Sequence, residues 1–241
     1  MTDKKTICFD TLKTRILSLE LPPGQPLEET QLSREFDISR TPLREVLQRL
    51  AGLGYVVLER HRGAVVAPMD LEVMRSFFQT APMIYATMAR LAAENATEDG
   101  VASLRAIQSD FRAAVEAGEP GRMVLHNHRF HEGIGEMSGN RYLLPSLHRL
   151  LIDHARMSQT FYRPRFKGEE GRVSAACSQH DDLIEAIAAH EPVRAVEITL
   201  AHWELSRHRI ELYVRPDPLP IDPTGPTAST APSDGGTRYA L

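Results

Sequence analysis

Residues 32–50 have the sequence LSREFDISRTPLREVLQRL, which predicts two short helices joined by a tight turn. The first helix is expected over 28–36, and the second begins after Ser39 or Thr41, either of which can cap its N-terminus. Pro42 fits the first turn, because the missing N–H of proline has no helical partner there. The apolar stripe of the second helix consists of Leu43, Val46, Leu47 and Leu50. Such a pair is typical of a helix-turn-helix.

The flanking segments extend this pair to a winged helix-turn-helix. An earlier helix is expected over 9–19, ended by the LPPG of residues 21–24. Two segments rich in β-branched residues follow the pair, at 55–58 and 64–66, and the basic sequence ERHRG separates them. They predict a small hairpin with a basic tip. We therefore expect residues 1–68 to form a winged DNA-binding domain whose third helix enters the major groove.

The chain after residue 68 has the apolar spacing of long helices. We expect an antiparallel bundle of six helices over 69–214, which binds an effector and forms the dimer contact. The predicted helices span about 70–95, 97–118, 120–137, 141–161, 171–189 and 192–214. Residues 215–241 are rich in proline and poor in apolar residues, so we expect a disordered tail. The predicted fold class is mainly α.

The composition of the 241 residues is that of a folded chain, with 42% hydrophobic and 25% charged residues. Its two cysteines, Cys8 and Cys177, provide neither a disulfide framework nor a thiolate metal cluster. No apolar run approaches the ~20 residues that span a bilayer. We expect a cytoplasmic protein with no membrane partner.

The net charge of −4 argues against a general polyanion binder, but positive charge is concentrated in the third helix and at the hairpin tip. Arg40 can form a bidentate pair with a guanine, whereas Ser39 and Thr41 are hydroxyl donors suited to phosphate oxygens. The predicted DNA contacts are Ser39, Arg40, Thr41, Arg44, Arg49, Arg62 and Gly63. On charge alone, an ordinary solvated helix face is an equal alternative.

Together these motifs resemble the DNA-binding domain of the GntR superfamily of bacterial regulators. The resemblance rests on SRTPLREVLQRL at 39–50 in register with RGAVV at 62–66, and with LPPGQPL at 21–27 it extends over about 12–67. It implies DNA contacts by the third helix and the wing, through Arg40, Thr41, Arg44, Arg62 and Gly63. One departure is Asp37, where the family often has glycine; aspartate tolerates a left-handed turn moderately well.

Four polar residues in the second part have the spacing of a metal site. Asn127 and His131 are four residues apart and therefore project from the same helix face. His180 and His202 lie equally far from the turn near Glu191, which places them at the same height in an antiparallel pair. Three imidazoles and one oxygen form a ligand set suited to Zn²⁺ or Ni²⁺, with positions open for water or an effector. By geometry alone, unrelated polar residues are the stronger alternative.

The segments NHRFH at 127–131, SGNRYL at 138–143 and HDDLIEAI at 180–187 are similar to the FCD effector domain of the FadR subfamily. The similarity covers about 70–212, and six helices resemble its VanR-type group. Metal-binding members hold the ion by an aspartate and three histidines, which correspond here to Asn127, His131, His180 and His202. Asparagine keeps a carbonyl oxygen but removes a charge. This weakens metal binding and favours a small anionic effector, such as a carboxylate, as an additional ligand.

The other histidines of the second part lack such a pattern, and we expect them on the surface or in a supporting position beside the site. They are His126, His128, His148, His154, His190 and His208. Trp203 is expected in the core or at a dimer contact. Arg90 and Arg156 fit either an effector contact or a solvated helix face, and the sequence does not decide between these.

We therefore predict a homodimeric transcriptional regulator, expected to be a repressor, that binds its operator as two half-sites. A carboxylate beside the metal would tie together the third, fifth and sixth helices of the second part and change the spacing of the two DNA-binding domains. One alternative is a metallohydrolase, in which the histidines hold a water-activating ion and Asp181 or Glu185 acts as base. Another is a winged domain that contacts only proteins, which predicts no salt-dependent DNA affinity.

Overall fold

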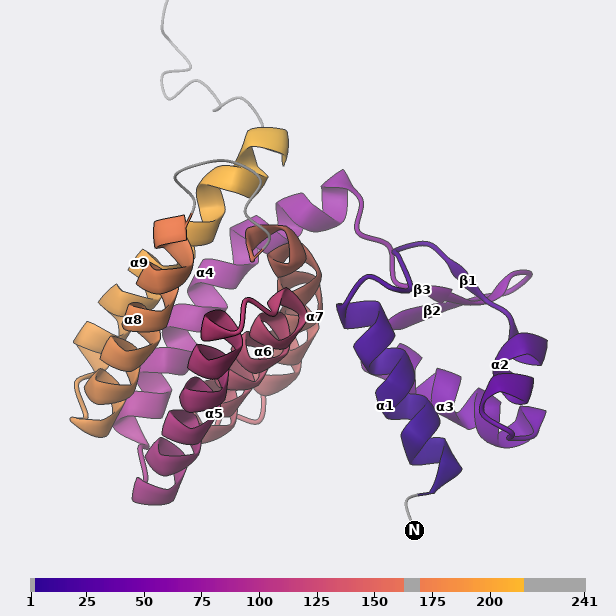
Figure 1. The fold of residues 1–241 in the computed structure, drawn as a ribbon, viewed down its shortest axis with the longest axis horizontal. Coiled ribbons are helices and arrows are strands. Elements are labelled where there is room, and N and C mark those ends of the chain that lie inside the picture. The colour runs from indigo at the N-terminus through magenta and orange to yellow at the C-terminus, as the bar shows by residue number, and fades with distance from the viewer. Residues whose placement is uncertain (1–2, 163–169, 215–241) are drawn as a thin grey trace, which may run out of the picture.

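The computed structural model describes the backbone of residues 3–162 and 170–214, and the side chains of these residues except 160, 170 and 206–214. Figure 1 shows two parts side by side, a small unit at the N-terminus and a larger helical bundle. The tail predicted over 215–241 lies outside the described residues. Among the described helices, none is long and apolar enough to cross a membrane.

The N-terminal part, here called the winged unit, consists of three helices and a small antiparallel sheet (Figure 1). Its elements are α1 (Lys4–Leu17), β1 (Pro26–Leu27), α2 (Glu29–Glu35), α3 (Arg40–Gly52), β2 (Val56–Glu59) and β3 (Gly63–Val66). The strand order is β1-β3-β2, and β2 pairs with β3 from Val56 opposite Val66 to Glu59 opposite Gly63. The expected winged helix-turn-helix is confirmed.

Two elements of the winged unit differ from the sequence-based expectation. The sequence does not predict β1, because two residues are too short to show the alternation of a strand. The sequence predicts α1 from Phe9, but the helix begins at Lys4, where polar residues give no apolar stripe. Ion pairs hold this first turn: Lys4 pairs with Asp37 on the turn before α3, and Lys5 pairs with Glu45 of α3 at 2.6 Å. Asp37 adopts a φ of +47° in that turn.

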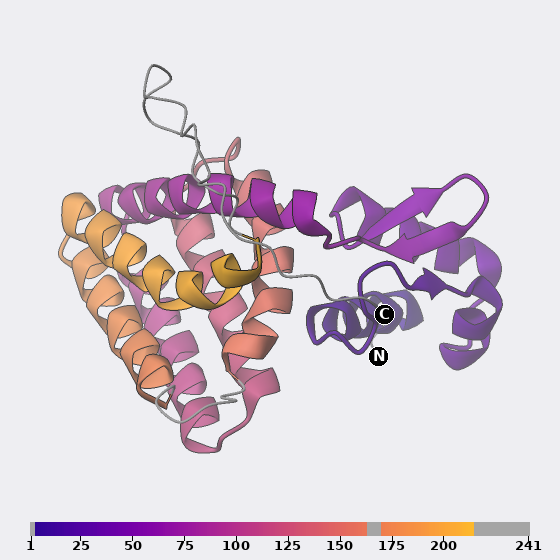
Figure 2. The same ribbon diagram turned by 90° about the horizontal axis from the view of Figure 1, so that it is seen from above.

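The second part is a bundle of six helices within the described residues (Figures 1 and 2). They are α4 (Leu71–Glu94), α5 (Glu98–Glu116), α6 (Pro120–Met137), α7 (Leu144–Phe161), α8 (Glu170–Ala188) and α9 (Pro192–Val214). Helix α4 packs on α9, α9 on α8, α8 on α5, α5 on α6, α6 on α7 and α7 on α4. The helices therefore enclose a common interior, and the expected mainly α fold is confirmed.

Side-chain caps explain where the bundle helices begin. Asp70 caps α4 by accepting the backbone N–H of Val73 at 2.9 Å. The chain stays helical through Pro82. Helix α7 begins at Leu144, later than expected, because the Asn140 side chain accepts the two preceding backbone N–H groups in a turn.

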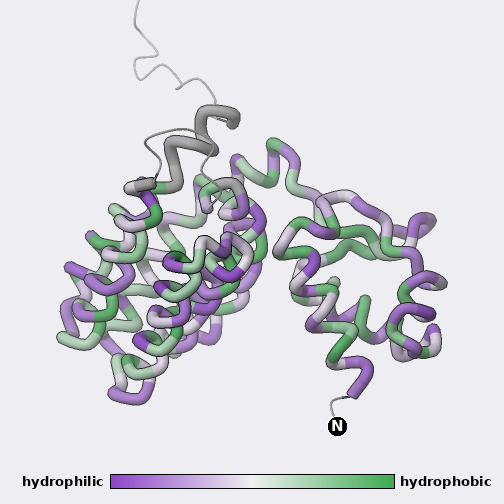
Figure 3. The backbone as a smooth tube through the Cα atoms, in the orientation of Figure 1, coloured by the Kyte–Doolittle hydropathy of each residue, from purple (hydrophilic) through white to green (hydrophobic). Residues whose placement is uncertain are grey.

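Apolar side chains bind the two parts together. Figure 3 shows hydrophobic and hydrophilic residues mixed along the coloured parts of the helices, as expected of amphipathic helices. One buried apolar cluster lies within the bundle, and another is shared by the winged unit and the bundle. The shared cluster contains Leu12 and Ile16 of α1 together with Ile152 and Ala155 of α7. Because α1 packs against α7, α7 belongs to the bundle and also supports the winged unit.

Candidate functional site

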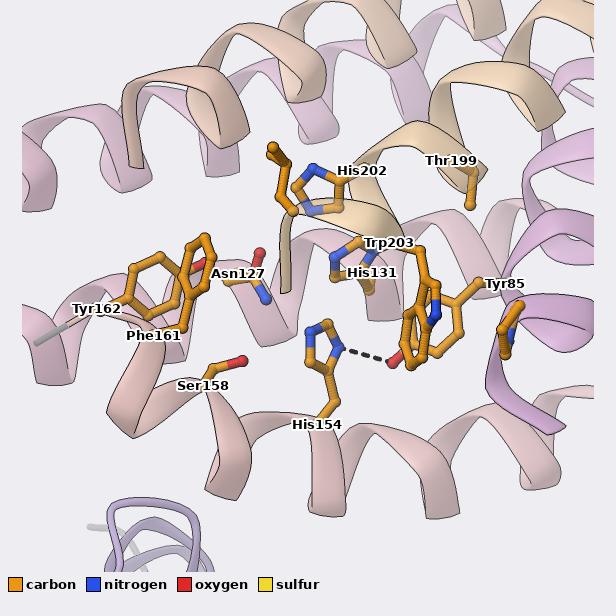
Figure 4. A pocket seen from close by; sticks show the side chains of 12 residues that line it. Tyr85, Asn127, His131, His154, Ser158, Phe161, Tyr162, Thr199, His202 and Trp203 are labelled. Carbon is orange, nitrogen blue, oxygen red and sulfur yellow. Dashed lines mark hydrogen bonds between the residues drawn. The ribbon is translucent and has the colours of Figure 1, made fainter. Parts of the chain in front are cut away.

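Three histidines converge in the interior of the bundle from three different helices. His131 on α6, His180 on α8 and His202 on α9 each offer a ligand atom, and these atoms all lie within 4.8 Å of one another. His131 and His180 are 4% and 0% exposed. The spacing along the sequence thus brings the three predicted imidazoles together, and Asn127 lies one turn before His131 on the same helix (Figure 4).

Three polar atoms of this site have no hydrogen-bond partner among the described residues. Among the described residues, Oδ1 of Asn127, Nε2 of His131 and Nε2 of His180 are buried and accept no hydrogen bond. Leaving buried polar atoms unpaired is unfavourable unless something else binds them. A carbonyl oxygen and imidazole nitrogens are donors that Zn²⁺ and Ni²⁺ accept. The residues present therefore fit a divalent ion.

Gln108 on α5 fixes the orientation of the His180 ring. Its Nε2 donates to the carbonyl oxygen of Cys177 at 2.8 Å and to Oδ1 of Asp181 at 3.0 Å. Its Oε1 must therefore accept, and Nδ1 of His180 lies 3.0 Å from it. His180 thus carries its proton on Nδ1, which leaves the lone pair of Nε2 free. The ring of Phe130 stacks on His180 with centroids 4.0 Å apart.

The three imidazoles are neutral near pH 7. Burial lowers the pKa of His131 and of His180 well below the usual histidine value, and neighbouring histidines lower both further. Burial also lowers the pKa of His202 to about 4. Nδ1 of His202 lies 3.1 Å from Oε1 of Gln179, an arrangement like that of His180. Neutral imidazole is the form that binds metal ions.

A cavity of about 20 Å³ lies beside the cluster (Figure 4). Since a water molecule needs roughly 10–15 Å³ by this measure, the cavity has room for little more than an ion or a water. Its walls come from α4, α6 and α9, and from α7 with its C-cap residue, and four of the lining residues have Phe, Tyr or Trp side chains. These are Tyr85, Phe161, Tyr162 and Trp203.

Some residues of the cavity wall and of the core are not predicted by the sequence. His154 lines the cavity, which agrees with the expected supporting position beside the site. His126 and His128 are only 7% and 4% exposed, so neither lies on the surface. No spacing pattern could have indicated His154 or Tyr85, because the packing of α7 against α4 brings them together. Trp203 is buried in the core and lines the same cavity. His208 lies outside the described side chains.

The two arginines that the sequence left undecided have different positions. Arg90 is exposed on α4 and pairs with Glu94 at 3.0 Å, which is a solvated helix face. Arg156 on α7 is 0% exposed. Its guanidinium pairs with Asp153 and donates to the carbonyl oxygen of Ala67 at 2.7 Å, on the segment that leaves the wing. Arg156 therefore joins the bundle to the winged unit rather than facing the cavity.

The predicted DNA contacts on α3 share one exposed surface. Ser39 is the N-cap residue, and Arg40, Thr41 and Arg44 follow in the first turns with exposed side chains. Backbone N–H groups at a helix N-terminus favour phosphate. Arg44 pairs with Glu29 at 3.0 Å, an exposed pair that a phosphate can replace.

The remaining predicted contacts lie on the wing and on the far end of α3. Arg62 and Gly63 are exposed at the turn between β2 and β3, where Gly63 has a φ of +71° that favours glycine. The guanidinium of Arg49 lies 4.0 Å from the ring centroid of Phe9. Arg49 thus helps to hold α1 on α3, and its contact with DNA stays a prediction.

Comparisons with known proteins match both parts of the chain. The family "Bacterial regulatory proteins, gntR family" matches residues 7–66, and the FCD domain matches 78–205. The Nta operon transcriptional regulator of Aminobacter aminovorans is 27% identical over 54% of this chain and 62% of that protein. The galactonate operon transcriptional repressor of Escherichia coli is 24% identical over 83% of this chain and 94% of that protein. The solved structure of E. coli McbR/YncC has the same fold, with a TM-score of 0.70 at 19% identity, and covers 88% of this chain and 97% of that chain.

Proposed function

Because the chain belongs to the gntR family of bacterial regulatory proteins, carries an FCD domain and is a DNA-binding transcriptional regulator, we propose that it acts as a metabolite-controlled repressor. Its affinity for the operator is set by a small carboxylate that binds beside a divalent ion in the bundle. The observation that supports this proposal is the convergence of three neutral imidazoles and unpaired buried polar atoms in the interior of the bundle. His131 and His202 of this group also line the cavity.

The residues that would hold the ion are Asn127, His131, His180 and His202. When bound, a Zn²⁺ or Ni²⁺ ion supplies positive charge and an open position for a carboxylate oxygen. Asn127 contributes a neutral oxygen, so the site keeps more positive charge than one with an aspartate. An anionic effector therefore completes the site better than a neutral one does.

Helix α7 offers a route from the cavity to the DNA-binding surface. One side of α7 places His154 and Ser158 in the cavity wall. Its other side holds the winged unit, since Arg156 donates to the carbonyl oxygen of Ala67 and Gln159 donates to that of Leu17 at 3.1 Å. Because the cavity has a volume of only about 20 Å³, an effector must displace its walls, and displacement of α7 changes the support of the winged unit.

This route changes the mechanism predicted from the sequence. The proposed ligands belong to α6, α8 and α9, the third, fifth and sixth helices of the bundle. The polar contacts with the winged unit described above, however, come from α7. We propose that the effector lowers operator affinity, because it disturbs contacts that hold the winged unit in place. One of the relatives is named as a repressor.

We further propose that the chain works as a homodimer in the cytoplasm, where bacterial operators are found. A single recognition helix reads too few base pairs for specific binding, whereas two winged units read two half-sites.

The metallohydrolase alternative is not supported. The relatives with given functions are named as transcriptional regulators. The two residues considered as its base lie in ion pairs, Asp181 with Arg112 at 2.6 Å and Glu185 with Arg105 at 2.9 Å. Neither carboxylate is among the described residues that line the cavity.

The test is a mobility-shift titration of the full chain on genomic fragments. We expect one fragment to be bound in preference to a scrambled competitor, with an affinity that falls steeply as salt rises. Arg40→Ala should weaken this binding by about 10-fold or more, since it removes a base contact. Arg90→Ala removes the same charge from an exposed position of the bundle and should have no effect. Equal binding of all fragments would contradict the proposal.

A further inference from the structure

The cavity wall formed by α7 carries a fourth imidazole that the proposed metal site does not use. His154 lines the cavity, but it is not part of the group whose ligand atoms lie within 4.8 Å of one another. The centroid of its ring lies 5.3 Å from that of His131. His154 is therefore close enough to contact an effector bound to the ion without itself being one of the proposed ligands.

A hydrogen bond to Tyr85 fixes which nitrogen of His154 carries the proton. The Tyr85 hydroxyl lies 2.9 Å from Nδ1 of His154. Burial raises the pKa of Tyr85 well above its usual value, so the phenol keeps its proton. A buried hydroxyl without an acceptor is unfavourable, and Nδ1 is the acceptor in reach. Tyr85 therefore donates to Nδ1, and the proton of His154 is on Nε2.

The Nε2–H group of His154 is directed into the cavity. Figure 4 shows the ring nitrogen that is not bonded to Tyr85 turned toward the space between Asn127 and Ser158. Ser158 lies one helical turn further along α7, and its hydroxyl reaches toward the same space. Burial lowers the pKa of His154 to about 3, so the imidazole is neutral at pH 7. Helix α7 thus presents two neutral donors beside the expected ion.

The other residues in the wall of the cavity are suited to contact with an apolar group. The rings of Tyr85 and Trp203 lie with centroids 6.0 Å apart, and Phe161 adds a further aromatic surface. No lysine or arginine occurs among the described residues that line the cavity. A second carboxylate would be buried against these rings without a charged partner, which is strongly unfavourable.

We infer that His154, positioned by Tyr85, donates from Nε2 to one oxygen of the effector carboxylate, and that the effector is a compact monocarboxylate with an apolar body. The other carboxylate oxygen binds the ion, so this inference rests on the proposed function. His154 then favours a carboxylate, whose second oxygen can accept its hydrogen bond, over a ligand whose only polar atom binds the ion. Tyr85 is a positioning residue, because it acts only through the tautomer of His154.

The experiment uses the full chain loaded with Co²⁺, whose visible absorption changes when a carboxylate joins its ligands. Butyrate is compared with succinate, which has the same number of carbons and a second carboxylate. The variants are His154→Leu, which removes the donor, His154→Gln, which keeps an N–H donor, and Tyr85→Phe. The matched controls are His148→Leu on the same helix and Tyr142→Phe, which is exposed. Calorimetry measures the Co²⁺ affinity of every variant.

We expect the wild type to bind butyrate at least about 10-fold more tightly than succinate, because a buried unpaired charge is unfavourable. His154→Leu should weaken the binding of butyrate by about 10-fold or more, because it removes a hydrogen bond to a charged group. Its Co²⁺ affinity should stay unchanged. His154→Gln should restore most of the butyrate affinity, Tyr85→Phe should lose part of it, and both controls should match the wild type.

Equal butyrate affinity in the wild type and His154→Leu would overturn the role of His154 while the metal-dependent function stands. Tighter binding of succinate would overturn the ligand class. A loss of Co²⁺ affinity in His154→Leu would show that this residue is a ligand and would also overturn the inference. If the wild type binds no Co²⁺, or binds butyrate equally well without it, the proposed function fails together with the inference.

Discussion

Gln108 determines which ring nitrogen of His180 would be free to bind a metal ion. Its amide nitrogen is held by Cys177 and Asp181, which leaves its oxygen to accept from Nδ1 of His180. Gln108→Leu removes that acceptor and allows the proton to move to Nε2, the atom that must be free. We expect the Zn²⁺ affinity to fall by about 10–100-fold, as for other residues that orient metal ligands.

Competition with a chromophoric chelator measures this loss. Gln79→Leu makes the same change at an exposed position of α4 and should leave the Zn²⁺ affinity unchanged. If Gln108→Leu binds Zn²⁺ as tightly as the wild type, His180 needs no partner to present Nε2.

We propose that Asn127 sets the relative affinities of the site for the metal ion and the effector. Asn127→Asp adds a negative charge beside the three neutral imidazoles. We expect Zn²⁺ to bind more tightly, by about 10-fold or more, because the carboxylate attracts the ion. Butyrate should bind more weakly to the loaded site, since the added charge repels it.

Calorimetry of both ligands tests this prediction, with Gln79→Glu as the control that adds the same charge on the surface. A variant in which Zn²⁺ and butyrate both bind as in the wild type would show that Asn127 does not face the ion.

The sequence predicts the residues of this site that depend on helical spacing. Asn127 and His131 share a face because they are four residues apart, and the antiparallel pair of α8 and α9 places His180 beside His202. Gln108, His154 and Tyr85 lie on three other helices. Their distances from the site depend on how whole helices pack against one another. The spacing of residues along a single helix gives no information about this packing.

Among the elements, we propose that α7 connects effector binding to DNA binding. Gln159 on α7 donates to the last turn of α1, at the carbonyl oxygen of Leu17. Gln159→Leu breaks this bond on the side away from the cavity. We expect unchanged affinities for Zn²⁺ and butyrate, while the effect of butyrate on operator affinity shrinks by about 2-fold or more, as when other coupling residues are changed.

Operator titrations with and without butyrate measure this coupling, again with Gln79→Leu as control. An effect of butyrate as large as in the wild type would show that the bond between α7 and α1 carries no signal. Substituting Arg156 is a poorer test, because its loss would leave the Asp153 carboxylate buried without its main partner.

Element boundaries could be predicted where capping residues and apolar stripes agree. Helix α9 begins at Pro192 as predicted, because proline is favoured in a first turn. Strand β1 could not be predicted, since it exists only by pairing with β3. The burial of Arg156 could not be predicted from the sequence either, because its partner Ala67 belongs to the other part of the chain.

At the scale of the whole molecule, the buried histidines predict a loss of stability in mild acid. Histidines in an unfolded chain titrate near pH 6.5, whereas burial lowers the pKa of His202 to about 4 and that of His154 to about 3. The pKa values of His131 and His180 also lie well below the usual value. Between pH 6.5 and about 4 the unfolded chain binds more protons, so the free energy of unfolding falls as pH falls.

Thermal denaturation of the metal-free chain followed by circular dichroism checks this sign. The melting temperature should decrease from pH 7 to pH 5, and Zn²⁺ should raise it at pH 7, because the ion binds the folded state. A melting temperature that does not change over this range would mean that these imidazoles titrate in the folded chain as they do in the unfolded chain.

In the proposed function, the winged unit binds the operator and the bundle binds the effector. The affinity for the operator therefore reports on both parts. That affinity is best measured by fluorescence anisotropy on a fragment that the protein selects from genomic DNA, for metal-free protein, Zn²⁺-loaded protein and Zn²⁺-loaded protein with butyrate. We expect butyrate to weaken binding by about 5-fold or more when Zn²⁺ is present and to have no effect without it. Equal affinities in all three states, or no preference over scrambled DNA, would contradict the control of DNA binding by the bundle.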